Sequence, residues 1–335
     1  MYYSAFFDQL SENRLPPCLV FFGEETYVME TAVDALRRQY LPDGLQVINE
    51  SVLSAQSTGQ QVWEDLQQLP IGAEKRIVTI KDWGALVMGE RVPDIDPIPE
   101  LLDKLPSTSL LLLILSRKPD KRKKLFTELQ KRDWIVEFLP LEEKRFFQVI
   151  RRELKKDGKD IEDKALSALM ENSSGLLLPA MQEIRKASSY VGERETITLE
   201  DMQQLLVPSL HQTVFDMVNM LCEGNEKQAL SLLRKLQENG TEPMALLGAL
   251  NRTYQQLFMA KSLLVQRASN DRIRQALDVS PYILRRITAR AQKQDLDRLR
   301  NCIDEIVKAE EEMKTGRMSM ENGFDLLFFQ LLKAA

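Results

Sequence analysis

The sequence has few of the residues that build metal centres, disulfide frameworks or histidine-dependent catalytic sites. Its 335 residues include one histidine, His211, and three widely separated cysteines, Cys18, Cys222 and Cys302. Three distant cysteines make neither a disulfide framework nor a zinc site. A lone histidine also weakens any Ser-His-Asp or Cys-His proposal, because histidine needs partner residues to be catalytic. We therefore expect no metal site and a structural or surface role for His211.

Long apolar runs are absent as well. No stretch approaches the roughly 18 consecutive apolar residues of a membrane-spanning helix, and the N-terminus lacks the basic region and apolar stretch of a signal peptide. Together with the scarce cysteines, these absences predict a cytoplasmic protein in a reducing compartment, without a membrane partner.

Positive charge is not in excess. The net charge of −5 provides no global attraction to nucleic acid, so any such binding must be local. Two basic runs lie at residues 117–124 and 144–159. Solvated charged faces explain both runs at least as well as contacts with phosphate do.

Residues 1 to about 140 alternate short apolar runs with helical patterns. The runs that predict strands are 19–22, 45–48, 76–80, 110–115 and 135–138. Apolar strands separated by helices are typical of a parallel sheet with helices on both faces. We therefore expect an α/β domain over residues 1–140.

Beyond Pro140 the sequence predicts helices and no strand. Short helices are expected over residues 143–157, 162–172 and 178–190, and a fourth is capped by Thr198. From residue 209 to 335, apolar residues recur at helical spacing and predict a bundle of five or six helices.

The first predicted strand ends where a nucleotide-binding fold carries its phosphate-binding loop. Such a loop needs G-x-x-x-x-G-K-[ST], because glycine amides, a lysine and a hydroxyl converge on phosphates and magnesium. Here the turn begins Gly23, Glu24, Glu25 and Thr26, with one glycine, no lysine and two carboxylates. The loop is degenerate, and we expect it to bind no nucleotide cofactor.

Seven segments, in order across nearly the whole chain, carry a family resemblance. The first four read FFGEETYVMETAV, LPIGAEKRIVTIKDW, PDKRKKLFTELQK and ITLEDMQQLLVPSLHQTVFDMVN. The last three read EPMALLGAL, DRIRQALDVSPYILRR and EEEMKTGR. Through them the chain resembles the bacterial DNA polymerase III delta subunit family of clamp-loader components. The resemblance implies an AAA+-like α/β domain over 1–140, a small helical lid domain over 141–208 and an all-α collar domain for oligomerisation over 209–335.

The resemblance also implies a function. Members of this family keep the AAA+ fold without using ATP, bind the sliding clamp (the beta subunit) and hold one of its interfaces open for loading on primed DNA. The implied partners are the clamp, ATP-using gamma/tau-type subunits, a delta-prime-type subunit and primed DNA. No catalytic site of its own is implied, although the subunit is part of a DNA-directed DNA polymerase holoenzyme.

Two positions besides the degenerate loop agree with the loss of ATP use. Lys81 occupies the first acidic position of the magnesium-binding pair, directly before Asp82. The lid helix begins at Leu178, where ATP-using relatives place an arginine against the γ-phosphate.

By position, the resemblance assigns clamp binding to Leu69, Pro70, Ile71 and Gly72. The family usually has a bulky apolar pair at the last two positions, so Gly72 either weakens the contact or is compensated by Leu69 and Ile71. Pro70 and Gly72 indicate a projecting turn, and we therefore favour Ile71 as the anchor. Alternatively, Leu69 and Ile71 belong to the domain core.

Two further sets of residues are candidates. The basic turn is a candidate DNA contact, although a solvated or subunit-facing patch is the favoured alternative; it comprises Lys121, Arg122, Lys123 and Lys124. Arg117 is not read as an arginine finger, because it ends a strand and Lys118 follows where a cysteine is expected. A collar segment, which is either a helix C-cap or an assembly contact or both, comprises Lys314, Thr315, Gly316 and Arg317.

The sequence leaves two alternative functions open. A divergent ATPase is disfavoured by the missing lysine and arginine. An AAA+-derived nucleic-acid-binding scaffold without clamp contact would use the basic runs, but the net charge is −5 and few aromatics beyond Phe146 and Phe147 are interleaved with the cations.

Overall fold

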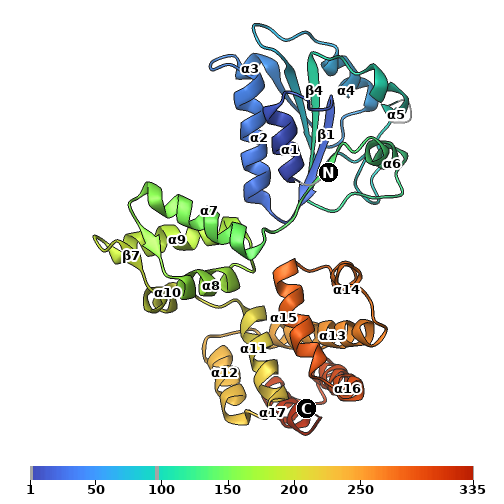
Figure 1. Ribbon diagram of the computed structural model, residues 1–335. Helices are drawn as coiled ribbons and strands as arrows, with labels where there is room; N and C mark the ends of the chain where they lie inside the picture. The colour runs from blue at the N-terminus through green and yellow to red at the C-terminus, as the bar shows by residue number, and fades with distance from the viewer. Residues whose placement is uncertain (1–2, 95–97, 335) are drawn as a thin grey trace. The chain divides into compact units, whose positions relative to one another are not determined.

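The computed structural model describes residues 3–94 and 98–334 (Figure 1). The chain divides between Pro140 and Leu141 into two compact units, and each unit is described by itself below.

The first unit is built on a five-stranded parallel sheet in the order β2-β3-β4-β1-β5. The strands are β1 (Cys18–Gly23), β2 (Glu50–Leu53), β3 (Arg76–Lys81), β4 (Ser109–Leu115) and β5 (Ile135–Phe138). The α/β class predicted from the sequence is confirmed. The apolar runs of β1, β3 and β4 are almost continuous because these central strands are buried on both faces.

One predicted strand is wrong. Residues 45–48 do not form a strand, because a short helix, α3 (Gln46–Asn49), occupies this position and β2 begins immediately after it. β2 is an edge strand that pairs only with β3, and none of its residues is fully buried. An edge strand needs no long apolar run, so the apolar residues before it were mistaken for the strand itself.

Helices cover both faces of the sheet. Figure 1 shows α1 (Tyr3–Ser11) and α2 (Thr26–Tyr40) on one face, and α4 (Gly59–Leu66) and α6 (Lys124–Lys131) on the other. Alternate residues of β1 serve the two faces, since Phe21 packs in the core with α1 and α2 while Val20 packs in the core with α4 and α6. The short helices α5 (Ile98–Leu101) and η1 (Leu102–Lys104) precede β4.

The second unit begins with four helices and a very small sheet. Its helices are α7 (Glu143–Lys156), α8 (Asp163–Asn172), α9 (Leu177–Val191) and α10 (Leu199–Leu205). Two parallel strands of two residues each, β6 (Asp160–Ile161) and β7 (Thr196–Ile197), pair between them. The prediction of no strand beyond Pro140 is therefore wrong, because strands this short leave no periodic pattern in the sequence.

Seven helices follow among the described residues from 210 to 334, rather than five or six. They are α11 (Leu210–Cys222), α12 (Glu226–Glu238), α13 (Pro243–Val265), α14 (Asn270–Leu277), α15 (Pro281–Gln292), α16 (Leu296–Lys314) and α17 (Met320–Ala334). The left-handed residue Asp278 ends α14, and Ser280 caps α15 by accepting a hydrogen bond from the Ile283 N–H.

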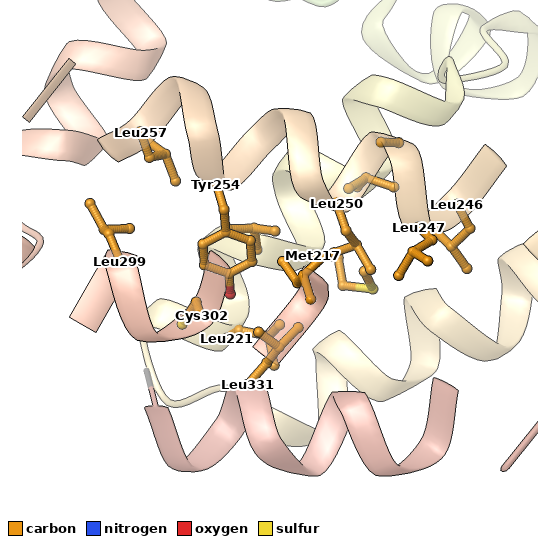
Figure 2. Close-up of a cluster of buried hydrophobic side chains, with 14 of the residues drawn as sticks. Met217, Leu221, Leu246, Leu247, Leu250, Tyr254, Leu257, Leu299, Cys302 and Leu331 are labelled. Carbon is orange, nitrogen blue, oxygen red and sulfur yellow. The ribbon is translucent and has the colours of Figure 1, made fainter. Parts of the chain in front are cut away.

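The core of these helices is apolar around one tyrosine. Figure 2 shows Tyr254 of α13 surrounded by leucines, with its hydroxyl directed toward Cys302 of α16. Tyr254 is fully buried. Burial raises the pKa of the Cys302 thiol to about 12, so this cysteine stays protonated and acts as a small apolar residue.

Asp201 in α10 allows a test of how this unit responds to pH. The Thr198 hydroxyl caps α10, and the Asp201 carboxylate accepts the Thr198 N–H in return. Arg194 also pairs with Asp201, at 2.7 Å from Nη2 to Oδ1. Hydrogen bonds from the Arg194 guanidinium, followed by that from the Thr198 backbone, hold the pKa of the Asp201 carboxyl well below its usual range.

We predict that Asp201→Asn lowers the urea midpoint of unfolding at pH 7 and lowers it clearly less at pH 2. The pKa of the carboxyl is lower in the folded chain than in the unfolded chain, where it is about 3.9. The charged form therefore stabilises the fold fully above about pH 4, and this stabilisation is lost gradually as the pH falls from there toward the lower pKa of the folded chain. Equal differences between variant and wild type at both pH values would contradict the assignment.

Candidate partner-binding site

A loop between α4 and β3 presents two aliphatic side chains to solvent. Leu69 is 74% exposed and Ile71 is 61% exposed. Between them Pro70 is half-buried, and the exposed Gly72 follows with a positive φ of 65°. Neither Leu69 nor Ile71 belongs to the domain core, which was the alternative left open by the sequence.

The backbone of Ile71 is held by a buried side chain from α3. The Ile71 N–H donates to Asn49 Oδ1 at 2.7 Å, and Asn49 Nδ2 donates to the Ile71 carbonyl at 2.9 Å. Asn49 Nδ2 also donates to the Leu45 carbonyl at 3.0 Å. Asn49 is completely buried, so the contact links an exposed loop to the interior of the domain.

The start of β3 is fixed by a buried arginine. Arg76 donates from Nη1 to the Ile48 carbonyl at 2.9 Å, and from Nη2 to Asp65 Oδ1 at 3.1 Å. It also contacts the Ser51 hydroxyl. The ion pair between Asp65 and Arg76 therefore joins the end of α4 to the start of β3, and the loop runs between these two fixed points.

The last residues of the loop are held from the other side. Asn13 donates to the Glu74 carboxylate at 3.0 Å and accepts a hydrogen bond from the Tyr40 hydroxyl at 2.8 Å. The Lys75 ammonium lies 5.2 Å from the centre of the Tyr40 ring, within range of a cation–π interaction. The loop between α4 and β3 is thus held at Ile71 by Asn49 and near its end by the contacts of Glu74 and Lys75.

The helix α3 adds exposed apolar surface next to this loop. Val47 is 92% exposed and Ile48 is about half exposed. Neither was among the predicted site residues, because both lie in the predicted strand 45–48. The polar neighbours Gln46, Asn49 and Glu50 were the signal against that assignment, since a strand buried on both faces rarely carries three polar residues around two apolar ones.

The backbone conformation explains why glycine, and not the bulky residue that the family resemblance implies, occupies position 72. Its φ is positive, and a Cβ there would lie 3.0 Å from the Leu45 side chain. A larger residue would be strained in this backbone conformation and would crowd Leu45. Leu69 and Ile71 are therefore left as the exposed aliphatic side chains of this turn.

The degenerate phosphate loop lies at the opposite end of the parallel strands, directly after β1. Gly23 has a φ of 140°, and a Cβ there would lie 2.2 Å from the Phe138 carbonyl oxygen of β5. The Glu25 N–H donates to the same oxygen at 3.0 Å, and the Glu25 side chain is buried. Glu24 is exposed and Thr26 begins α2. The turn therefore packs closely against β5.

The acidic position after β3 is also engaged. Asp82 accepts hydrogen bonds from the Ser116 N–H at 2.7 Å and from the Ser116 hydroxyl at 2.8 Å. This carboxylate thus connects the ends of β3 and β4.

The basic turn carries cations that are already paired. The Arg122 guanidinium binds both oxygens of Asp120, at 2.9 and 3.0 Å, and lowers the pKa of that carboxyl to about 2. Lys124 lies 3.2 Å from Glu100, and Lys123 donates to the Glu90 carbonyl. Lys121 is exposed. Of these contacts, the Lys124–Glu100 pair is exposed on both sides, and such a pair contributes little stability, so Lys124 is able to exchange its partner for a phosphate. The partner of Arg122 is different, because Asp120 is buried.

The collar segment forms a helix C-cap. The helix α16 ends at Lys314, which pairs with Glu310. The Thr315 hydroxyl donates to the Glu311 carbonyl at 2.7 Å. Gly316 has a φ of 72° and its N–H donates to the Met313 carbonyl at 3.2 Å. Arg317 follows on the exposed surface.

Among residues 3–94 and 98–334, no group of three or more His, Cys, Asp or Glu is placed to hold a metal ion. The helices in these ranges are too short or too polar to cross a membrane.

Family models and individual relatives both match this chain to DNA polymerase III delta subunits. The model for "DNA polymerase III, delta subunit" matches residues 19–139, and that for "DNA polymerase III delta subunit, C-terminal domain" matches residues 211–331. The DNA polymerase III subunit delta of Bacillus subtilis (strain 168) is 26% identical over 330 residues, which cover 97% of this chain and 95% of that protein. The Escherichia coli (strain K12) subunit is 23% identical over 249 residues, which cover 73% and 70%.

Among solved structures, the Bacillus subtilis DNA clamp loader delta protein has the same fold. It superposes with a TM-score of 0.69 at 23% identity and covers 98% of this chain and 99% of that one.

We predict that Gly23→Ala lowers the free energy of unfolding by about 2–4 kcal/mol, through steric overlap and backbone strain. The matched control is Gly44→Ala, which also has a positive φ but has open space around its Cβ, and which should cost about 1 kcal/mol. Urea unfolding of both variants measures the difference. Equal costs would show that close packing against β5 is not what requires glycine at position 23.

Proposed function

Because the chain belongs to the DNA polymerase III delta subunit family of clamp-loader components, we propose that it binds the sliding clamp and holds one of its interfaces open without hydrolysing ATP. The observation that carries this proposal is the fixed loop that exposes Leu69 and Ile71. Apolar side chains on a preorganised turn suit a pocket on a partner, because little conformational entropy is lost on binding.

The burial of Leu69 and Ile71 could supply enough free energy to shift the opening equilibrium of the clamp. Burying one Leu or Ile side chain contributes about 1.5–3 kcal/mol, so Leu69 and Ile71 together supply about 3–6 kcal/mol. A ligand shifts an equilibrium only by its difference in affinity for the two states. If this contact is made fully only with the open clamp, it shifts the opening equilibrium by about two to four orders of magnitude. Val47 and Ile48, beside the loop, extend the same proposed surface.

Three features support the absence of ATP hydrolysis in the proposal. The Gly23 turn packs against β5, Lys81 occupies an acidic position, and Asp82 binds Ser116. ATP-using gamma/tau-type subunits would then supply the energy that exposes or buries the loop.

The proposed roles follow the three regions of the chain. The α/β domain (1–140) binds the clamp, residues 141–208 form the lid, and the collar (209–335) serves oligomerisation. The proposed location is the cytoplasm. The C-cap from Lys314 to Arg317 is proposed as a contact with neighbouring subunits, including one of the delta-prime type.

Contact between primed DNA and Lys121, Arg122, Lys123 and Lys124 is a further part of the proposal. It is supported by the exposure of Lys121, Arg122 and Lys124 and by the ease with which the exposed Lys124–Glu100 pair exchanges. The alternative, a nucleic-acid-binding scaffold without clamp contact, predicts affinity that falls steeply with salt. Binding through aliphatic side chains has a shallow dependence on salt.

We predict that Ile71→Ser weakens nucleotide-independent binding to the sliding clamp of the same organism by about 30–150-fold, which corresponds to the loss of about 2–3 kcal/mol of apolar burial. Stability should change by less than about 0.5 kcal/mol, because the side chain is exposed. Surface plasmon resonance with immobilised clamp measures the affinity.

The matched control is Met88→Ser, which removes an equally exposed apolar side chain (68%) beyond the opposite end of β3. Its affinity should equal that of the wild type. If Ile71→Ser also binds normally, the anchor moves to Leu69, and Leu69→Ser becomes the decisive variant. A wild-type chain that does not bind the clamp would overturn the proposed function.

A further inference from the structure

The buried side chain of Asn49 makes hydrogen bonds to both backbone groups of one exposed loop residue, Ile71. Asn49 is the last residue of α3 and is completely buried. Its carboxamide accepts from the N–H of Ile71 and donates to the carbonyl of the same residue, as a neighbouring strand would. Such pairing fixes the φ and ψ of one residue from both sides. A buried group thereby orders a segment whose own side chains lie in solvent.

The residues around Ile71 do not order the loop by themselves. Pro70 has no N–H to donate, and Gly72 gives the backbone additional freedom. The exposed side chains of Leu69 and Ile71 contribute no burial that would hold the turn in place. The conformation of Ile71 therefore depends on the contacts that its backbone makes.

We infer that Asn49 is the positioning residue for partner binding, because its carboxamide holds Ile71 in the presented conformation before the partner arrives. The inference rests on the proposed function for the identity of the partner. It adds a residue that makes no contact of its own with the clamp pocket and acts only through the Ile71 backbone. Without this contact, the loop would have to be ordered during binding, and the affinity would fall.

The first test follows the Ile71 amide in the free chain and needs no clamp. Asn49→Ala should increase its hydrogen-exchange rate at least about tenfold, because the acceptor of its N–H is removed. The amide of Leu112, in the core of β4, is the control and should exchange at the wild-type rate. If the Ile71 amide keeps its protection, Asn49 does not order the loop and the inference is wrong.

The second test is a double-mutant cycle in clamp binding. Asn49→Ala should weaken binding by about 5–20-fold in the wild-type background and by less than about twofold in the Ile71→Ser background. A general structural defect would weaken binding equally in both backgrounds and would overturn the positioning role. Loss of protection at Ile71 without any loss of affinity would overturn it too.

A further variant covers the case in which Asn49→Ala does not fold. Asn49→Leu has nearly the same shape, fills the same buried space and lacks both the acceptor and the donor. It should therefore lose protection of the Ile71 amide and bind the clamp less tightly than the wild type does. Retained protection or normal affinity in this variant would overturn the positioning role.

Clamp binding by the wild type separates failure of the proposed function from failure of the positioning role. If the wild-type chain does not bind the clamp, the proposed function fails, and the positioning role in clamp binding fails with it. The exchange of the Ile71 amide would still show whether Asn49 orders the loop. If the wild type binds but the cycle is additive, only the positioning role is lost.

Discussion

A buried arginine at the start of β3 determines how this end of the α/β domain is built. A guanidinium removed from water needs charged and polar partners, because its desolvation is otherwise too costly. Arg76 finds them in Asp65 at the end of α4, in the Ile48 carbonyl of α3 and in Ser51 of β2. Three segments must therefore meet at one point, and their meeting brings Asn49 beside Ile71.

The two ends of the parallel sheet carry different features. Ligands of α/β proteins usually bind at the carboxyl ends of the strands, and there Gly23 packs closely against the Phe138 carbonyl. The exposed aliphatic loop lies instead where β3 begins. The carboxyl ends of the strands thus carry a closely packed turn, and their amino-terminal ends carry the surface proposed to bind a partner.

The sequence predicts the buried parts of the fold well and the marginal parts poorly. The three central strands β1, β3 and β4 lie where apolar runs predict them, because a strand buried on both faces needs such a run. The edge strand β5 was also placed correctly. The edge strand β2 was placed five residues too early, and the two-residue strands β6 and β7 were missed. Short or half-exposed elements depend on tertiary pairing and leave too few residues for a periodic pattern. The same limit applies to α14 and α15, which are separated by the left-handed Asp278.

By itself, the sequence determined the α/β class, the mainly helical remainder and the degenerate phosphate loop, because burial patterns and motifs are local. The candidate loop was placed through the family resemblance. Only the tertiary structure decided that Leu69 and Ile71 are exposed and that Val47 extends their surface. The contact between Asn49 and Ile71 joins residues 22 positions apart. No local pattern encodes it, because the two residues are brought together by the pairing of β2 with β3 and by the buried charge of Arg76.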